Sequence, residues 1–145
     1  MKPITVTVDL DLPASEVFAF LSDFENNPRF QKGMRSCVWT SPPPHGVGST
    51  YDQVAHFLGR EIVSSFVVVE HAPGHRVKIE STSGPFPIEE TRIVEARGEG
   101  CRVTAIVGGD ASGFLQLLAP LQRPLVKRSV TRDYRQELPR ALGVR

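Results

Sequence analysis

Two residues of opposite charge alternate on one predicted strand of this chain. Glu90 and Arg92 lie in the segment 88–96 and share a face with Ile88 and Val94, because residues two apart point to the same side of a strand. If that face is interior, each charge needs the other as a partner. Such a pair can orient a carbonyl or hydroxyl group, or transfer a proton if burial raises the pKa of the carboxyl group. Glu90 and Arg92 are therefore the candidate catalytic residues, and the sequence leaves open the alternative in which they face solvent.

Aromatic and apolar side chains supply candidates for the wall of a pocket. Tyr51, Gln53 and Phe57 share one face of the predicted strand 49–58, and a buried tyrosine hydroxyl normally finds a polar partner. Ordinary core packing is the alternative for every member of the set. The candidate pocket residues are Phe20, Phe24, Tyr51, Gln53, Phe57, Phe66, Phe86, Leu118, Leu121 and Tyr134.

Other catalytic and binding motifs are weak in this sequence. The segment GGDASG, residues 108–113, has Asp110 where a dinucleotide loop needs a glycine, so we interpret it as a turn with a helix cap at Asp110 or Ser112. No GxSxG motif indicates a serine hydrolase. The four histidines are scattered, and the only cysteines, Cys37 and Cys101, are expected to be buried thiols rather than a disulfide. We therefore expect neither a metal nor a cofactor.

Composition favours one domain that spans residues 1–145. The chain has 17 Lys and Arg against 16 Asp and Glu, a net charge of +1, whereas nucleic-acid-binding domains usually carry a clear basic excess. No apolar segment has the length of a membrane span, and the first residues lack the core of a signal peptide. We expect a cytoplasmic protein with no nucleic-acid partner and no stable membrane insertion. The basic residues between 127 and 140 are expected to face solvent rather than a membrane.

The order of elements predicts an α+β fold. The segment 4–12 alternates as a strand does, and Val17, Phe18, Leu21 and Phe24 then recur at helical spacing. A second short helical turn follows around Phe30. Six further strands joined by short turns are typical of an antiparallel sheet. They are predicted near residues 34–41, 49–58, 61–70, 76–81, 88–96 and 101–108.

The last segment predicts a helix that covers the concave side of this seven-stranded sheet. Pro120 and Pro124 interrupt an amphipathic pattern that has two apolar stripes, rotated by roughly a quarter turn. Because a proline inside a helix removes one hydrogen bond, we predict a short helix at about 113–119, a bend, and a main helix from about 122 to 138. One helix over a curved sheet leaves room for a cavity.

Four local features resemble the START-like, or SRPBCC, superfamily and its polyketide cyclase/dehydrase and lipid-transport branch. The first is LPASEVFAFLSDFENNPRF, similar to that branch's first helix and asparagine–proline–aromatic turn, with Phe30 where the branch frequently has a tryptophan. The second is the glycine pair of GVGSTY. The third is the hairpin VVVEHAPGHRVKIES, and the fourth is GCRVTAIV with the helix that follows it.

The resemblance implies a helix-grip fold, in which a curved antiparallel sheet wraps around a long C-terminal helix and encloses an apolar cavity. It implies a hydrophobic small-molecule partner, such as a lipid or polyketide. It also implies an alternative, a polyketide cyclase, aromatase or dehydratase that uses the same cavity. No nucleophile, metal set or cofactor loop is visible, so binding is favoured over catalysis. Homodimer formation stays open.

Overall fold

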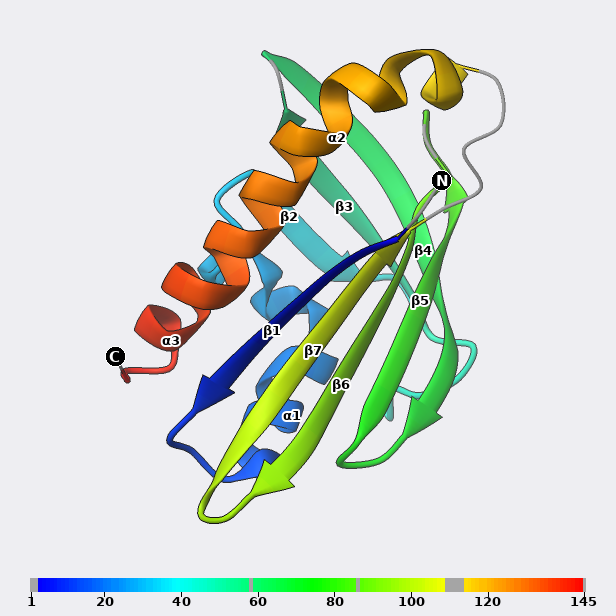
Figure 1. Ribbon diagram of the computed structural model, residues 1–145. Helices are drawn as coiled ribbons and strands as arrows, with labels where there is room; N and C mark the ends of the chain where they lie inside the picture. Colours follow the sequence, from blue (N-terminus) through cyan, green and yellow to red (C-terminus); the bar gives the residue numbers. More distant parts are fainter. Residues whose placement is uncertain (1–2, 58, 86, 109–113, 145) are drawn as a thin grey trace.

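The computed structural model describes residues 3–57, 59–85, 87–108 and 114–144, with the backbone alone for Phe57 and residues 114–122. Figure 1 shows a curved sheet with a long C-terminal helix across its open side and two short helices at one end. Within these described residues, no helix is both long enough and apolar enough to cross a bilayer.

The sheet has seven strands in the order β1-β7-β6-β5-β4-β3-β2, and every neighbouring pair is antiparallel. All seven predicted strands are confirmed. Register shifts occur in β2 between Met34 and Ser36 and in β4 near Phe66 and Val68; such bulges bend a strand and increase its twist. The strands are β1 (Ile4–Leu10), β2 (Met34–Trp39), β3 (Thr50–Phe57), β4 (Arg60–Ala72), β5 (Arg76–Ser83), β6 (Glu89–Arg97) and β7 (Gly100–Gly108).

The alternation of apolar residues decides which face of the sheet is interior. On β1, Ile4, Val6 and Leu10 are buried while their neighbours are exposed or half-buried. On the opposite face, Val38 and Val63 remain exposed. The predicted free thiols are confirmed, because Cys37 and Cys101 are both buried and unpaired.

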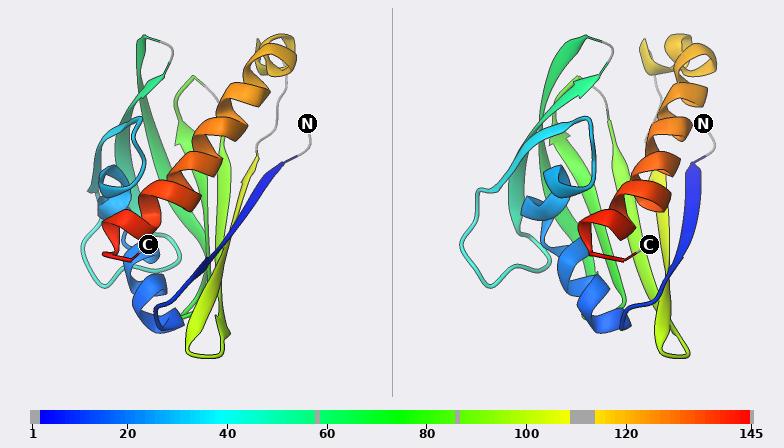
Figure 2. Two further views of the ribbon diagram at one scale, coloured as in Figure 1. Left: turned by 60° about the vertical axis from the view of Figure 1, so that its left-hand side comes forward. Right: turned by 90° about the vertical axis from the view of Figure 1, so that its left-hand side faces the viewer.

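Two short helices close one end of the curved sheet, as the sequence predicts. Helix α1 (Ala14–Ser22) buries Val17, Phe18 and Leu21, and the 3-10 helix η1 (Phe24–Arg29) follows after one residue. That residue, Asp23, caps η1 by accepting a hydrogen bond from the N–H of Glu25 at 3.2 Å. The two views of Figure 2 show α1 below the end of the C-terminal helix and η1 beside that end.

The C-terminal helix differs from the prediction in where its regularity is lost. Helix α2 (Phe114–Arg132) continues past both Pro120 and Pro124, so the prediction of a separate helix that ends at residue 119 is wrong, although Figure 1 shows the predicted bend between the first turns of α2 and the rest of the helix. A proline removes one backbone hydrogen bond, and this kinks a helix more readily than it ends one. The departure from α geometry comes later, at the π-helical turn η2 (Asp133–Glu137), before α3 (Leu138–Ala141).

Candidate ligand-binding site

Arg92 lies in the interior between β6 and the short helices. Its side chain is 1% exposed, and its Nη1 donates a hydrogen bond to the backbone oxygen of Leu21 at 2.7 Å. The guanidinium carbon lies 4.7 Å from the ring centre of Phe24 and 5.4 Å from that of Phe30, distances at which an aromatic face attracts a cation. The sequence left open whether Arg92 faces the interior or solvent, and the structure places its side chain in the interior.

Glu90 is the charged partner of Arg92. Its two carboxylate oxygens accept hydrogen bonds from Nε and Nη2 of Arg92, both at 3.4 Å. The hydroxyl of Tyr134 donates to Glu90 Oε1 at 2.5 Å. Burial opposes the charged form of Arg92, but the carboxylate of Glu90, together with the hydroxyl groups of Tyr134 and Tyr51, outweighs it, and the pKa of the guanidinium is raised. The Tyr134–Glu90 hydrogen bond thus joins the C-terminal helix to strand β6 beside this buried ion pair.

Tyr51 is enclosed by aromatic rings beside this pair. Its ring stacks on Phe24 with centres 4.9 Å apart, and on Phe66 with centres 5.2 Å apart. Burial raises the pKa of the Tyr51 hydroxyl, and that of Tyr134, well above the ordinary value. Both phenols are therefore neutral hydrogen-bonding groups at physiological pH.

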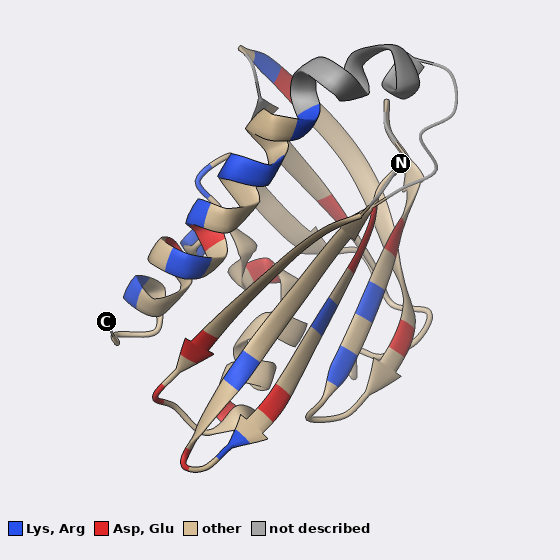
Figure 3. Ribbon diagram, viewed as in Figure 1, with Lys and Arg blue, Asp and Glu red and all other residues tan. Residues whose placement is uncertain are grey.

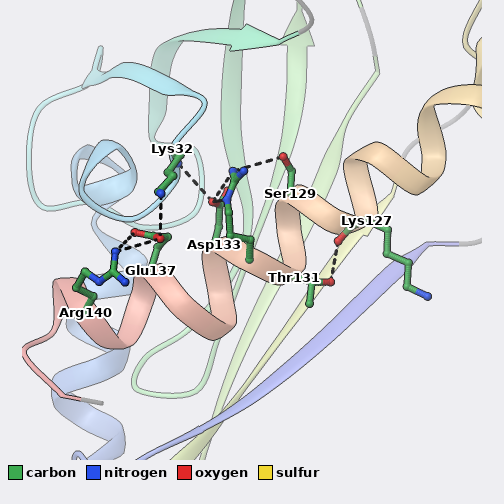
Figure 4. A network of polar contacts seen from close by, with 8 residues as sticks. Lys32, Lys127, Ser129, Thr131, Asp133, Glu137 and Arg140 are labelled. Carbon is green, nitrogen blue, oxygen red and sulfur yellow. Dashed lines mark hydrogen bonds and ion pairs between the residues drawn. The ribbon is translucent and has the colours of Figure 1, made fainter.

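The π-helical turn η2 aims two consecutive side chains inward. Asp133 and Tyr134 are both buried. Successive side chains of an ordinary α-helix are about 100° apart around the helix axis. A π-helical turn has more residues per turn, so this angle is smaller and both side chains can point to the same side of the helix. Figure 4 shows Lys32 beside this turn: its backbone N–H donates to Asp133 Oδ1 at 3.4 Å, and its Nζ lies 3.3 Å from Glu137 Oε1. These contacts connect the loop after η1 to the C-terminal helix.

A cavity of about 140 Å³ lies between the sheet and the C-terminal helix. A cavity of about 150 Å³ accommodates benzene, so the part of this cavity formed by the described residues has the size of one aromatic ring. Its wall combines aliphatic side chains with amides, carboxylates and phenols. The lining residues are Asn27, Gln31, Met34, Tyr51, Gln53, Phe66, Ile79, Ile88, Glu90, Val107, Val130, Asp133 and Tyr134.

The candidate pocket residues predicted from sequence fall into three groups. Tyr51, Gln53, Phe66 and Tyr134 line the cavity, together with Glu90. Two others, Phe20 and Phe24, lie away from the lining and pack against Phe30 and Arg92 respectively. The rest cannot be placed, because Phe86 and the side chains of Phe57, Leu118 and Leu121 lie outside the described residues, as does the predicted helix cap at Asp110 or Ser112.

Sequence reasoning missed several lining residues. In the sequence, Asn27 belongs to the asparagine–proline–aromatic turn, and Asp133 lies among the basic residues that are expected to face solvent. A polar residue at each position carries no signal of burial by itself, since the 3-10 and π-helical turns that orient them have no simple hydrophobic period. Ile79 and Val130 could be assigned to apolar faces, but not to a cavity.

A second hollow of about 240 Å³ lies beside α1 and the loop before β3. It contains His71 and also His45, whose ring stacks on Trp39 with centres 3.9 Å apart. His56 lies on strand β3, where its ring could face the interior, but the residue is exposed. In the described part of the chain, no three His, Cys, Asp or Glu side chains converge on a possible metal site. No described side chain of the C-terminal helix lines this hollow, so the first cavity is the better candidate.

Asp133 gives a pH-dependent prediction. Burial raises the pKa of its carboxyl group above the ordinary 3.8, although Arg132 opposes this with a hydrogen bond. The folded protein therefore takes up this proton at a higher pH than the unfolded chain, and it gains stability as the pH falls through the folded-state pKa. The free energy of unfolding of the wild type, minus that of Asp133→Asn, should therefore increase as the pH is lowered from neutral to about pH 4. Urea unfolding at a series of pH values measures this difference; a constant or falling difference would show that burial does not control this group.

A curved antiparallel sheet around a C-terminal helix, with a cavity between them, defines the helix-grip class of START-like proteins. Residues 1–141 match the family model described as polyketide cyclase / dehydrase and lipid transport, and the chain belongs to this family. An uncharacterized protein of Mycobacterium tuberculosis (strain ATCC 25618 / H37Rv) is 33% identical over 103 residues, which are 71% of this chain and 57% of that protein. A Mycobacterium bovis protein matches equally. The chain thus spans little more than half the length of these curated relatives.

Solved structures share the fold at low sequence identity. A protein of Thermus thermophilus, TTHA0849, superposes with a TM-score of 0.75 at 20% identity, covering 97% of this chain and 93% of that one. The Zhui aromatase/cyclase from Streptomyces sp. R1128 gives the same TM-score and coverage at 12% identity. A START superfamily protein from Mycobacterium smegmatis gives a TM-score of 0.69 at 18% identity, covering 98% and 94%. These similarities establish the architecture.

Proposed function

We propose that this protein binds a hydrophobic small molecule, such as a lipid or polyketide, in the cavity between the sheet and the C-terminal helix. The observation that carries the proposal is the cavity itself, which is lined by the apolar residues Ile79, Ile88, Val107 and Val130 and by polar groups that include Glu90. Natural ligand pockets combine apolar walls with a few placed polar groups in this way. The family description, which includes lipid transport, supports the same conclusion.

Filling the cavity tests this proposal. Val130 is half-buried on α2 and lines the cavity, so Val130→Phe should place a ring in the space that the ligand needs. Binding of toluene, a probe of one-ring size, should be weakened by at least about tenfold in isothermal titration, whereas overpacking should cost only about 1–3 kcal/mol of stability.

The matched control is the same substitution on the outer face of the sheet. Val63 lies on β4 with 59% of its side chain exposed, and Val63→Phe should leave toluene binding unchanged. Thermal unfolding of both variants checks that each is folded. Equal binding by the wild type and Val130→Phe would place the ligand elsewhere, and no binding of either toluene or resorcinol to the wild type would contradict the proposal.

The buried Tyr134–Glu90 contact favours a second candidate function, that of a cyclase, aromatase or dehydratase. A phenol that donates to a carboxylate inside a cavity can transfer a proton to or from a bound polyketide chain. Under this alternative, Glu90→Gln should abolish turnover of a linear poly-β-ketone thioester while binding of the chain persists, and Tyr134→Phe should do the same. Unchanged turnover in both variants would remove Glu90 and Tyr134 from the mechanism.

A further inference from the structure

Two buried oxygen atoms in the cavity wall have no hydrogen-bond partner among the described residues. They are Asn27 Oδ1 and Gln31 Oε1, and both residues line the cavity. Asn27 is 2% exposed, and its amide nitrogen is already used in a hydrogen bond to Cys37 Sγ at 3.7 Å. An unpaired buried acceptor is costly, so a donor that enters this cavity recovers a hydrogen bond that the protein alone does not make.

The rest of the polar wall also favours donors over anions. Glu90 and Asp133 both face the cavity, and each carboxylate is paired with its neighbouring arginine, Arg92 or Arg132. None of the described lining residues is a lysine, arginine or histidine. Figure 3 shows Lys and Arg gathered instead along the C-terminal helix, where Lys127, Arg128, Arg135 and Arg140 are exposed. A carboxylate ligand would therefore meet two negative groups and no unpaired cation from this wall.

We propose that the ligand inserts an uncharged, ring-sized group that carries at least two hydroxyl or amino donors, which bind Asn27 Oδ1 and Gln31 Oε1. The inference rests on the proposed function, since it assigns a chemical class to the ligand of the same cavity. The size follows from the volume of about 140 Å³, and the donors follow from the two unpaired oxygens. A fatty acid with its carboxylate in this cavity is disfavoured.

Three one-ring probes separate these possibilities by isothermal titration to the full chain. Resorcinol carries two donors, toluene none, and benzoate a negative charge. Resorcinol should bind the wild type at least about tenfold more tightly than toluene, and benzoate should bind most weakly. Equal or tighter binding of toluene would overturn the donor inference but leave the cavity as a binding site. Tightest binding by benzoate would overturn it as well, and binding by no probe would overturn both proposals.

Substitutions of the two amides assign the effect to these oxygens. Asn27→Leu and Gln31→Leu, made separately, should each weaken resorcinol binding by about fivefold or more without weakening toluene binding. Two positions are used because Gln31 is only half-buried, so its variant should fold even if Asn27→Leu does not. Ser64→Ala is the matched control, because Ser64 Oγ is also buried and unpaired but does not line this cavity. If both amide variants bound resorcinol as tightly as the wild type does, the donors would bind elsewhere.

Discussion

Replacing Arg92 with methionine lowers the free energy of unfolding by about 3–5 kcal/mol, because it leaves the Glu90 carboxylate in the interior without its cation. Glu90 is only 11% exposed, so water cannot easily take the place of the guanidinium. The substitution also removes the hydrogen bond to the Leu21 oxygen and the contact with the ring of Phe24. Urea unfolding followed by circular dichroism measures the loss.

Two comparison variants make this result specific. Arg102 forms the same kind of ion pair, with Asp9 at 2.7 Å, but on the exposed face of the sheet, and Arg102→Met should change stability far less. The double variant Glu90→Met/Arg92→Met should be more stable than Arg92→Met alone, since no unpaired charge is left inside. If Arg92→Met and Arg102→Met were equally stable, the interior position of Arg92 would be refuted.

The second large effect concerns Phe24, which lies between the ion pair and the aromatic wall. It is 1% exposed, stacks on Tyr51, and lies against the Arg92 guanidinium. Phe24→Ala should cost about 3–5 kcal/mol, the usual range for a fully buried aromatic side chain. Loss of this ring should also weaken toluene binding, because Tyr51 depends on it for its orientation in the cavity wall.

Phe20 provides the matched substitution for Phe24. It is the same residue type, four positions earlier, but its ring is only half-buried, with the guanidinium of Arg29 over it at 4.9 Å. Phe20→Ala should cost clearly less stability and leave toluene binding unchanged. Similar losses for both variants would mean that Phe24 has no special place in the interior. The same denaturation and titration experiments compare them.

Elements with a strong apolar period could be predicted from the sequence. The seven strands and two short helices follow from alternation and helical spacing, and the same alternation identified the face shared by Glu90, Arg92 and Val94. The sequence of the strand could not show whether that face is interior, because this depends on where α1 and the C-terminal helix pack against the sheet. Phe24 and Arg92 are 68 positions apart in sequence, yet the guanidinium lies against the ring.

The features that the sequence did not reveal depend on irregular backbone. The prolines suggested a break near residue 120, but α2 bends there without ending, and the helix widens only at η2, where Asp133 and Tyr134 turn inward. The turn itself contains no proline or glycine, although Pro139 follows it by two residues. Asn27 lies in a 3-10 helix whose orientation is fixed by packing rather than by periodicity. The polar part of the cavity wall can therefore be identified only once the tertiary contacts are known.

The position of a bound probe tests the central claim most directly. In a methyl-labelled sample with resorcinol, intermolecular nuclear Overhauser effects should connect the ring protons to the methyl groups of Ile79, Ile88, Val107 and Val130, which line the cavity. Contacts confined to the exposed valines of the surface, Val38, Val47 and Val63, would contradict a ligand site between the sheet and the C-terminal helix.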